Sequence, residues 1–412
     1  MKHFYKDKKE EEVCRSCGYD HINTLVDLGC QPPSNRFESE DNVCGDYHSL
    51  TFGQCPRCGF IQLINPMPPG TVMSRYKWVT YREPESHLND VADRLSKLPD
   101  LDKTALIRGI TYKDDSTLSR LKGIGFKNTY RYDKVEDLGL IKSCAALESI
   151  QEALTPETVA RILDRRGKAD LLSVRHLLEH AHNPLAFLHS IRQLVWPGGY
   201  LWFEVPECST FFKACDYSFI WEEHITYFST NTLKSFFRNA DMNLVDVIAY
   251  PNQYEDSLVC IARNEAWAGE QEVDKKALEA ILKQGQIFSD SFNATRERIH
   301  AVFKSWKELD KRVAVFGAGH LAAKFINFFG LSHLVECVFD DHPSKVGLLM
   351  PGSRVPIRNS ETLSEMDICL LSLSPESEKQ VMAKHQSYRD HGGRFLSIFA
   401  NNEHSIYSEK VS

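Results

Sequence analysis

Four cysteines near the N-terminus have the type and spacing of a metal site. Cys14 and Cys17 form one Cys-x-x-Cys pair, Cys55 and Cys58 form another, and a glycine follows each pair directly. Two thiolates two residues apart can reach one ion from a tight turn, and two such pairs supply a complete tetrahedron of sulfur ligands. A shell closed by four thiolates leaves no position for water, so the sequence predicts a structural zinc ion.

The paired cysteines have two other interpretations, a redox Cys-x-x-Cys and chance. A redox motif would not usually come twice with matching glycines at Gly18 and Gly59, which favours zinc. Cys30 and Cys44 lie between the pairs without a paired neighbour and are interpreted as spare thiols. The stretch LVDLGCQPPSNRF between the pairs has one arginine and no basic stripe, which argues against a module that binds nucleic acid.

The whole chain has the composition of a globular protein with two or three domains. It has 412 residues, of which 42% are hydrophobic and 25% charged, and its net charge is -7. This charge argues against binding to nucleic acid or to an anionic membrane. The N-terminus MKHFYKDKKEEE lacks the apolar region of a signal peptide, and no apolar run approaches the roughly 20 residues that span a bilayer. We therefore expect a cytoplasmic protein, whereas its oligomeric state is not indicated.

From about residue 87 the chain alternates between helical and strand-like patterns. Apolar periodicity predicts a helix over 86–98, a strand over 104–112, a helix over 116–126 and a strand over 128–133. There follow a helix that begins with a Thr cap and a proline, an apolar strand, another helix, a PGG breaker and the strand YLWFEVP. This β-α-β order predicts a parallel sheet flanked by helices.

The C-terminal third repeats a strand, a tight turn and a helix in RVAVFGAGHLAAKFINFFG. Asp340 and Asp341 come about twenty residues later, as in a dinucleotide-binding fold. A lone Gly-Ala-Gly turn of this kind is weak evidence for NAD. Before it, residues 271–311 carry apolar residues at helical spacing among many charges, which predicts two packed helices.

Four stretches, in this order, resemble the three-domain sugar C-methyltransferases. They are the paired cysteines, ADLLSVRHLLEHAHNPLAFLHSIRQLVWPGGYLWFEVP, WEEHITYFS and PGSRVPI. The longest of them resembles the later half of a class I methyltransferase domain, which uses S-adenosylmethionine (SAM). The resemblance implies an α/β fold with a zinc ribbon-like module over 1–75, a Rossmann-like SAM-dependent methyltransferase domain over 76–265, a helical connector over 266–310 and a second Rossmann-like domain over 311–412.

The resemblance implies methyl transfer from SAM to a carbon of a nucleotide-bound keto deoxysugar. It places the general base on His224 of WEEHITYFS, with Glu223 as its neighbour and Tyr227 as a substrate contact. His180 matches another active-site histidine, expected to hydrogen-bond the developing oxyanion or the sugar. Tyr76 corresponds to a tyrosine that lines the substrate site. A base is chemically reasonable, because a C–H next to a ketone is acidic enough for imidazole to remove its proton.

Other assignments of these roles stay open. The segment of the base could be a polar loop with a satisfied histidine. His176 and His182 are close neighbours of His180 in sequence, so one of them could take its role. Tyr81 is as available as Tyr76 for the substrate site.

Two departures from the family pattern bear on the chemistry. Trp221 stands where the family has a tyrosine three residues before the base, and indole has no phenolic hydroxyl to donate. The SAM loop, which is glycine-rich in class I methyltransferases, has only Gly109, with Asp114 among residues where small ones are usual. Asp133 is still well placed to accept the ribose hydroxyls of SAM. Gly109, Asp114 and Asp133 are therefore the expected cofactor-binding residues.

The family holds its nucleotide-sugar with the C-terminal domain and without a nicotinamide. This favours a phosphate contact from the backbone N–H groups of Gly317, Gly319 and His320. Two other functions stay open: an NAD-dependent nucleotide-sugar oxidoreductase or epimerase that uses the Gly-Ala-Gly turn, and a non-catalytic nucleotide-sugar binding protein that has lost SAM.

Overall fold

The computed structural model describes residues 13–42, 45–73, 85–140, 147–252, 255–269 and 274–410. The chain divides into two compact units. The first comprises Met1–Asn23, Gly53–Ser209 and Glu223–Leu282, and the second comprises Thr24–Phe52, Thr210–Glu222 and Lys283–Ser412. Both units are discontinuous in sequence, so the four linear domain boundaries expected from the sequence stay a prediction.

A mixed six-stranded sheet forms the centre of the first unit. Its strands are β4 (Leu106–Gly109), β5 (Asn128–Arg131), β6 (Ala169–Arg175), β7 (Val195–Glu207), β9 (Asn243–Tyr250) and β10 (Asp256–Arg263). Their order is β5-β4-β6-β7-β10-β9. β4 to β7 are parallel, as the β-α-β pattern predicted, whereas β10 runs antiparallel to both β7 and β9.

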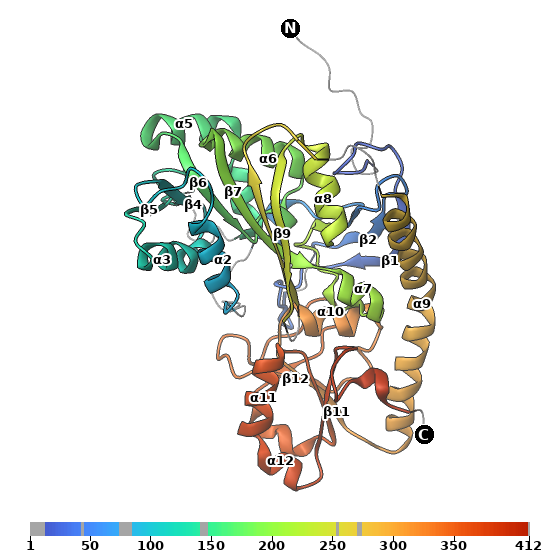
Figure 1. The fold of residues 1–412 in the computed structure, drawn as a ribbon. Helices are drawn as coiled ribbons and strands as arrows, with labels where there is room; N and C mark the ends of the chain where they lie inside the picture. The colour runs from blue at the N-terminus through green and yellow to red at the C-terminus, as the bar shows by residue number, and fades with distance from the viewer. Residues whose placement is uncertain are drawn as a thin grey trace. The chain divides into compact units, whose positions relative to one another are not determined.

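Helices cover both faces of this sheet (Figure 1). One face carries α2 (Leu88–Ser96) and α3 (Asp115–Gly123), and the other carries α5 (Pro156–Arg166), α6 (Pro184–Ile191) and α8 (Thr230–Asn239). Successive residues of a strand point to opposite faces. On β7, Trp202 therefore packs with α2 and α3, while Leu201 and Phe203 pack with the other three helices. The central strands are apolar on both faces, as the sequence predicted for a covered parallel sheet.

The helix starts follow local capping chemistry. The Thr155 hydroxyl accepts the N–H of Thr158 at 3.3 Å, with Pro156 at the first helical position of α5. Asn183 caps α6 in the same way by accepting the N–H of Ala186 at 3.0 Å. Such caps satisfy the N–H groups that a helix leaves unpaired in its first turn. The predicted start of α5 is thus confirmed. Two shorter helices are α1 (Pro69–Val72) and α4 (Leu147–Ala153).

The PGG sequence lies inside β7 and does not end it. Ala169 of β6 pairs with Val195 and Leu171 pairs with Tyr200, so the residues between form a bulge in β7. Gly198 has a φ of +81°, a conformation that glycine adopts without strain. The predicted break between the helix and the strand YLWFEVP was misplaced, because β7 already begins at Val195 and continues through a bulge at PGG.

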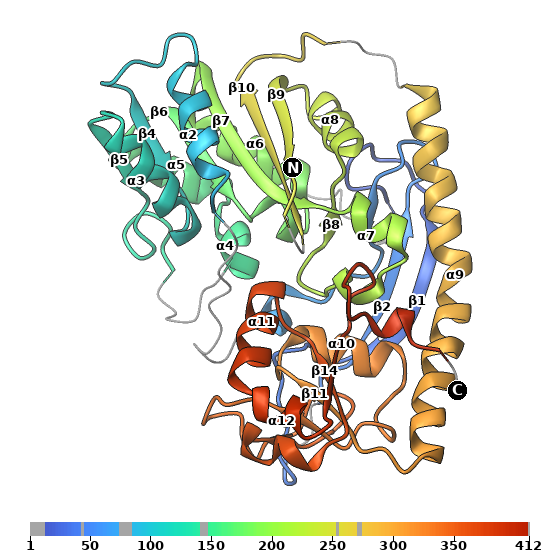
Figure 2. The same cartoon turned by 60° about the horizontal axis from the view of Figure 1, so that its bottom comes forward.

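A five-stranded parallel sheet forms the C-terminal part of the second unit. Its strands, in the order β13-β12-β11-β14-β15, are β11 (Val313–Phe316), β12 (Cys337–Phe339), β13 (Ile357–Arg358), β14 (Ile368–Leu371) and β15 (Arg394–Ser397). Its helices are α10 (His320–Phe328), α11 (Pro375–Lys384) and α12 (Gln386–Asp390). Figure 2 shows α11 and α12 beside β11 and β14, where Phe316 and Leu371 share a core with Tyr388. The predicted second Rossmann-like domain is confirmed.

One long helix, α9 (Lys275–Glu308), occupies the predicted connector, where the sequence pattern predicted two helices. No proline interrupts these 34 residues. Gly285 is buried within the helix, and a glycine there costs only about 1 kcal/mol relative to alanine. That cost is too small to end a helix of this length. Other elements are β1 (Asn23–Gln31), β2 (His48–Gln54) and α7 (Ser209–Ala214).

Candidate active site and zinc centre

The four predicted zinc ligands lie together in the first unit. The Sγ atoms of Cys14, Cys17, Cys55 and Cys58 are all within 4.8 Å of one another. Cys14 and Cys58 are 3.6 Å apart at their sulfurs, and Cys17 and Cys55 are 3.7 Å apart. Tetrahedral zinc with bonds of about 2.3 Å places its sulfurs about 3.8 Å apart, whereas a disulfide needs about 2.05 Å. The four thiols therefore fit a zinc ion.

The two cysteine pairs have the same backbone geometry. The N–H of Gly18 donates to the carbonyl of Cys14 at 2.9 Å, and the N–H of Gly59 donates to that of Cys55 at 2.9 Å. The φ angles are +70° at Gly18 and +74° at Gly59. A residue with a Cβ would be strained at this φ, so the glycine after each pair closes the turn that presents the sulfurs.

His224 lies in what we call the base segment, residues 223–229. Its β8 strand (Thr226–Tyr227) pairs antiparallel with β3 (Ile61–Leu63), which begins three residues after Cys58. The carbonyl of Ile225 accepts the N–H of Leu63 at 2.9 Å. The Cys55–Cys58 pair thus leads directly into the strand that holds the base segment.

Further bonds hold the base segment to η3 (Leu178–His180), the single turn that follows β6. The N–H of Ile225 donates to the carbonyl of Glu179 at 2.8 Å. Nδ1 of His180 lies 2.8 Å from the carbonyl oxygen of Glu223. A carbonyl oxygen can only accept, so Nδ1 of His180 carries a hydrogen, and in the neutral form of the ring the lone pair lies on Nε2.

The structure brings the two predicted histidines together. The ring centroids of His180 and His224 are 4.9 Å apart in a T-shaped arrangement. Tyr227 is buried, and its ring centroid lies 6.2 Å from that of His224. Burial lowers the pKa of the nearby His182 to about 4, so that ring is neutral at physiological pH. His180 links this turn to the base segment, because its ring contacts His224 and its Nδ1 donates to the carbonyl of Glu223.

Glu179 belongs to this cluster, and sequence reasoning did not single it out. Its side chain is buried, and a carboxylate oxygen lies within 4.8 Å of a ring nitrogen of both His180 and His224. The signal in the sequence was its place next to His180 in the turn after an apolar strand. Tyr76, the remaining predicted catalytic residue, lies outside the described residues.

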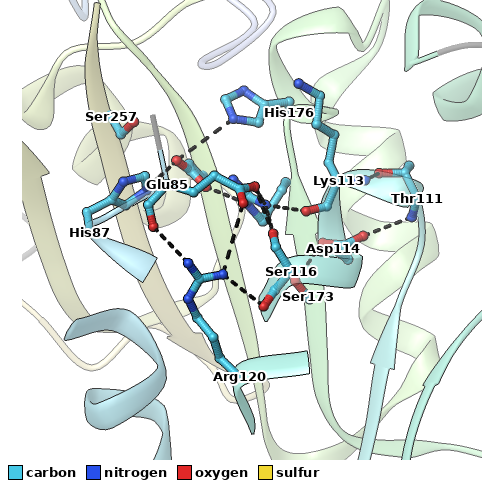
Figure 3. Close-up of polar contacts among 12 residues, drawn as sticks. Glu85, His87, Thr111, Lys113, Asp114, Ser116, Arg120, Ser173, His176 and Ser257 are labelled. Atoms are coloured by element: carbon cyan, nitrogen blue, oxygen red, sulfur yellow. Dashed lines mark hydrogen bonds and ion pairs between the residues drawn. The ribbon is translucent and has the colours of Figure 1, made fainter. Parts of the chain in front are cut away.

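The predicted cofactor loop, residues 109–116, is held by a buried carboxylate. Oδ2 of Asp114 accepts the N–H groups of Ile110 and Thr111, each at 2.8 Å. Oδ1 of Asp114 accepts the hydroxyl of Ser173 at 2.6 Å, and Figure 3 shows this side chain between Thr111 and Ser173. A Cβ on Gly109 would lie 2.6 Å from Cβ of Asp114. The glycine therefore makes room for the aspartate that folds over it.

Arg175 fastens the same loop from the end of β6. Its Nε donates to Oε2 of Glu204 at 2.5 Å, and both side chains are fully buried. Its Nη1 donates to the hydroxyl of Ser116 at 3.0 Å, to Glu85 at 3.1 Å and to the carbonyl of Lys113. The guanidinium thus joins the loop to the sheet. Figure 3 labels Lys113, Ser116 and Glu85, the three residues that Nη1 of Arg175 contacts.

The carboxylate of Glu204 is kept ionised in this buried place. Burial alone would raise the pKa of Glu204, but a hydrogen bond with His87 and the charges of His176 and Arg175 hold it well below its usual range. Nδ1 of His87 and Nη2 of Arg175 are buried without a hydrogen-bond partner among the described residues. Unsatisfied buried groups are rare in proteins. This edge of the sheet therefore holds buried polar atoms whose hydrogen bonds the described residues leave unmade.

Asp133 follows β5 and is exposed. Its Oδ1 accepts the N–H groups of Val135 at 2.8 Å and Glu136 at 2.7 Å, so it caps a turn. One carboxylate oxygen is thereby fixed at the carboxyl end of the strand next to β4. The contact of Asp133 with the ribose stays a prediction.

The Gly-Ala-Gly turn joins β11 to α10 in the second unit, as predicted. The N–H of Gly317 donates to the carbonyl of Phe339 at 2.8 Å, and that of Gly319 donates to the carbonyl of Gly317 at 2.8 Å. Both groups are therefore bonded inside the protein. The N–H of His320 lies in the first turn of α10, which has no intrahelical acceptor. The phosphate contact of these three residues stays a prediction, and the geometry favours His320.

Asp340 is used within the same turn. Its Oδ2 accepts the N–H of Ala318 at 3.0 Å and lies 2.9 Å from Nζ of Lys345. Nζ of Lys345 also donates to the carbonyl of Ala318 at 2.7 Å. In dinucleotide-binding folds an acid at this place accepts ribose hydroxyls. Asp340 is therefore used in part by its own turn, and the NAD alternative stays open.

Trp221 and His320 stack on each other in the second unit. Their ring centroids are 4.4 Å apart, with the planes inclined by 19°. Burial lowers the pKa of His320 to about 4, so its ring is neutral. The adjacent Glu222 pairs with Lys324 and accepts the N–H and hydroxyl of Ser34, each at 2.6 Å. The indole that replaces the family's tyrosine thus has an aromatic partner.

In the part of the chain that the structure describes, no helix combines the length and apolar character needed to cross a membrane.

Three family models match the chain in succession. A zinc binding domain matches residues 14–72, a methyltransferase domain matches residues 111–247 and a C-methyltransferase C-terminal domain matches residues 265–399. This is the order predicted from the motifs. The first match contains all four clustered cysteines, which confirms the zinc prediction.

One curated relative aligns with nearly the whole chain. The C-methyltransferase NovU of Streptomyces niveus is 24% identical over 406 residues, which cover 93% of this chain and 94% of the relative. Among solved structures, the 1,6-didemethyltoxoflavin-N1-methyltransferase of Burkholderia thailandensis is 16% identical with a TM-score of 0.29, covering 44% of this chain and 79% of that one. The N-methyltransferase NodS of Bradyrhizobium japonicum is 15% identical with a TM-score of 0.27, covering 44% and 96%.

Proposed function

Because the chain is a three-domain, SAM-dependent C-methyltransferase with a structural zinc ion, we propose that it methylates the carbon next to the ketone of a nucleotide-linked deoxysugar. The observation that carries the proposal is the pair of imidazoles, His180 and His224, with ring centroids 4.9 Å apart at the end of β6. An oxygen or nitrogen acceptor has its own lone pair, whereas a carbon acceptor must first lose a proton. A carbonyl beside that carbon makes the proton acidic enough for a histidine base.

We assign the two histidines different roles in this step. His224 takes the proton from carbon, because the base segment holds it by backbone bonds while its side chain remains partly exposed. His180 lies beside it with Nδ1 engaged by the carbonyl of Glu223. A proton on Nε2 would make His180 an imidazolium that donates to the developing enolate oxygen. That donor would take the place of the phenol that the family has at position 221.

The cofactor is proposed to lie over the carboxyl ends of β4 and β5. Bound SAM supplies an electrophilic methyl group on a sulfonium ion. Asp133 would accept hydrogen bonds from the ribose hydroxyls, since it follows β5 at that edge. Asp114 and Arg175 would act indirectly, because their hydrogen bonds fix the backbone of the cofactor loop.

The nucleotide-sugar is proposed to meet the C-terminal domain through the first turn of α10. The N–H groups of a helix N-terminus favour a phosphate, and α10 begins at His320 directly after the glycine turn. The match to a C-methyltransferase C-terminal domain over residues 265–399 includes this turn. The class of substrate comes from the family resemblance of the motifs.

The test measures the proton-transfer step separately from methyl transfer. Full-length protein is incubated in deuterated buffer with a set of nucleotide-linked keto deoxysugars, with and without SAM, and the products are analysed by mass spectrometry. We expect exchange of the hydrogen next to the ketone, and a methylated product when SAM is present. If no keto sugar exchanges hydrogen or gains a methyl group, while the protein binds SAM, the proposed acceptor is wrong.

His224→Ala is expected to lower methyl transfer and hydrogen exchange by about 100-fold to 10,000-fold, the usual effect of losing a positioned base. The affinity for SAM should stay within a few-fold of the wild type, because the base acts on the sugar. The measurements are initial rates and calorimetric titration with SAM. A variant that turns over at nearly the wild-type rate would overturn the assignment to His224.

A further inference from the structure

The three side chains at the end of β6 also have the composition of a metal site. Glu179, His180 and His224 each offer one ligand atom, and these atoms lie within 4.8 Å of one another. We propose that they form an additional site, separate from the four thiolates, for a first-row divalent cation such as Zn²⁺ or Co²⁺. Two imidazoles and one carboxylate bind such ions better than they bind Mg²⁺ or Ca²⁺.

Glu179 provides the first argument. Its side chain is buried, with an exposed fraction of 1%. Oε1 lies 3.3 Å from Nδ1 of His176, whereas Oε2 is buried without a hydrogen-bond partner among the described residues. A buried carboxylate oxygen without a donor is costly. A cation beside Oε2 would remove that cost.

The orientation of His180 provides an independent argument. Nδ1 donates to the carbonyl of Glu223 at 2.8 Å, which fixes the ring and leaves the lone pair on Nε2. Metal-binding histidines commonly donate their other ring N–H to a carbonyl or a carboxylate in this way. The backbone of the base segment therefore supplies the outer contact of a metal ligand.

The spacing requires a small adjustment. Ligands at about 2.0 to 2.2 Å from an ion lie about 3 to 4 Å from one another. The ligand atoms, now within 4.8 Å, would reach that spacing by side-chain rotation. This cluster contains three protein ligands among the described residues, so a bound ion keeps at least one open position, unlike the closed four-thiolate site.

A cation at this site would affect turnover through the lone pair of His224, an inference that rests on the proposed function. A cation bound to His224 occupies the electron pair that would otherwise accept the proton from carbon. The ion and the proton therefore compete, and a filled site holds the enzyme in a form that does not abstract a proton. The metal site would regulate the reaction and would not take part in it.

The binding test uses the purified, zinc-loaded, full-length protein and Co²⁺ as the probe, without SAM or sugar. Calorimetric titration and visible absorption should show about one additional ion per chain, with ligand-field bands but without the thiolate-to-cobalt charge-transfer bands of a sulfur site. Glu179→Gln is expected to weaken this binding about tenfold or more, as loss of a ligand does. His224→Ala should do the same.

Glu223→Gln is the matched control, because it removes a carboxylate next to His224 and keeps the backbone carbonyl. It should bind Co²⁺ within a few-fold of the wild type. Absence of an additional ion in the wild type, or equal binding by Glu179→Gln, would overturn the proposal. Neither result depends on the sugar, so failure of the hydrogen-exchange assay and failure of the metal site remain distinguishable. If Co²⁺ binds but does not inhibit hydrogen exchange, the regulatory role is wrong.

Discussion

The base segment and the cofactor loop of the same domain are positioned in opposite ways. The base segment, residues 223–229, is held by main-chain bonds to β3 and η3. The cofactor loop, residues 109–116, is held by the buried side chains of Asp114 and Arg175. Backbone pairing tolerates many side chains but depends on the partner strand. Buried side chains can hold a loop that lacks the usual glycines, but the conformation of that loop then depends on a few single residues.

Because of this difference, separate substitutions should affect cofactor binding and the position of the base. Removing a buried side chain that holds the loop should weaken cofactor binding and leave the base in place. Disturbing β3 should displace the base and leave the cofactor loop intact. Four predictions test this separation, beginning with the largest expected effect.

Loss of zinc should act on the base segment. The double variant Cys55→Ser and Cys58→Ser is expected to hold less than about half an equivalent of zinc. Methyl transfer should fall by about 100-fold to 10,000-fold, because β3 no longer positions His224. Affinity for SAM should stay within a few-fold of the wild type, which also shows that the methyltransferase sheet remains folded. Metal analysis, rates and calorimetry measure the three quantities.

Cys30→Ser is the matched control for that variant, since Cys30 lies outside the cluster and is exposed. It should keep zinc and activity. Full zinc in the double variant, or wild-type turnover without zinc, would contradict the link between the metal and the base.

Loss of Asp133 should act on the cofactor alone. Two charge-assisted hydrogen bonds to the ribose, at about 1.5 to 3 kcal/mol each, imply that Asp133→Ala weakens SAM binding more than tenfold. Asp115→Ala is the control, because Asp115 is an acid of the same region in a surface ion pair with Arg131 at 2.8 Å. Calorimetric titration decides between them. Equal affinities for the two variants would mean that SAM does not use Asp133.

Two substitutions of Asp114 should separate its shape from its charge. Asp114→Ala leaves the N–H groups of Ile110 and Thr111 without their acceptor, and two hydrogen bonds at about 1 kcal/mol each imply roughly thirtyfold weaker SAM binding. Asp114→Asn keeps one oxygen for these groups and an amide for Ser173, so its affinity should stay within a few-fold. Zinc content should not change in either variant. If alanine and asparagine bind SAM equally well, the loop is not held by this side chain.

The fourth prediction concerns the pH dependence of stability. Burial raises the pKa of Asp114 to about 6, although Ser173 and backbone N–H groups oppose the shift. The folded protein thus holds this proton more tightly than the unfolded chain, where the pKa is about 3.9. The contribution to stability is complete below about pH 4 and is lost as the pH rises through about 6.

Asp114→Asn cannot titrate, so its free energy of unfolding should rise relative to the wild type by at most about 3 kcal/mol between pH 4 and pH 7. Urea unfolding at a series of pH values measures this difference. A difference that stays constant with pH would show that Asp114 is ionised in the folded protein throughout.

The sequence was sufficient where spacing alone determines geometry. The two Cys-x-x-Cys-Gly pairs predicted the zinc cluster, because each knuckle is a local turn. Alternation of apolar strands and amphipathic helices predicted both sheets, since the spacing of apolar residues shows which face of a helix or strand is buried. The PGG bulge and the uninterrupted α9 were missed, because glycine permits these conformations as readily as it ends an element.

The rest of the candidate site depends on contacts between residues far apart in sequence. Nothing in Ile61 or Thr226 indicates that their strands pair. Arg175 and Glu204 each read as a polar residue near the end of a strand, and their burial as a pair appears only in the sheet. Glu179 was not predicted, because the active-site role at this turn was assigned to its neighbour His180, which matched the family motif. Tertiary pairing therefore supplied what periodicity could not.

The pairing of β3 with β8 also determines how such an enzyme can be recombined. A chimera that joins the N-terminal module of one relative to the remaining chain of another would pair a β3 strand and a β8 strand from different proteins. Ile61 faces Tyr227 and Gln62 faces Thr226 in this register, and a shift of one residue would turn every side chain of the short strand to the other side. The N-terminal module and the base segment should therefore be inherited, and exchanged, as one piece.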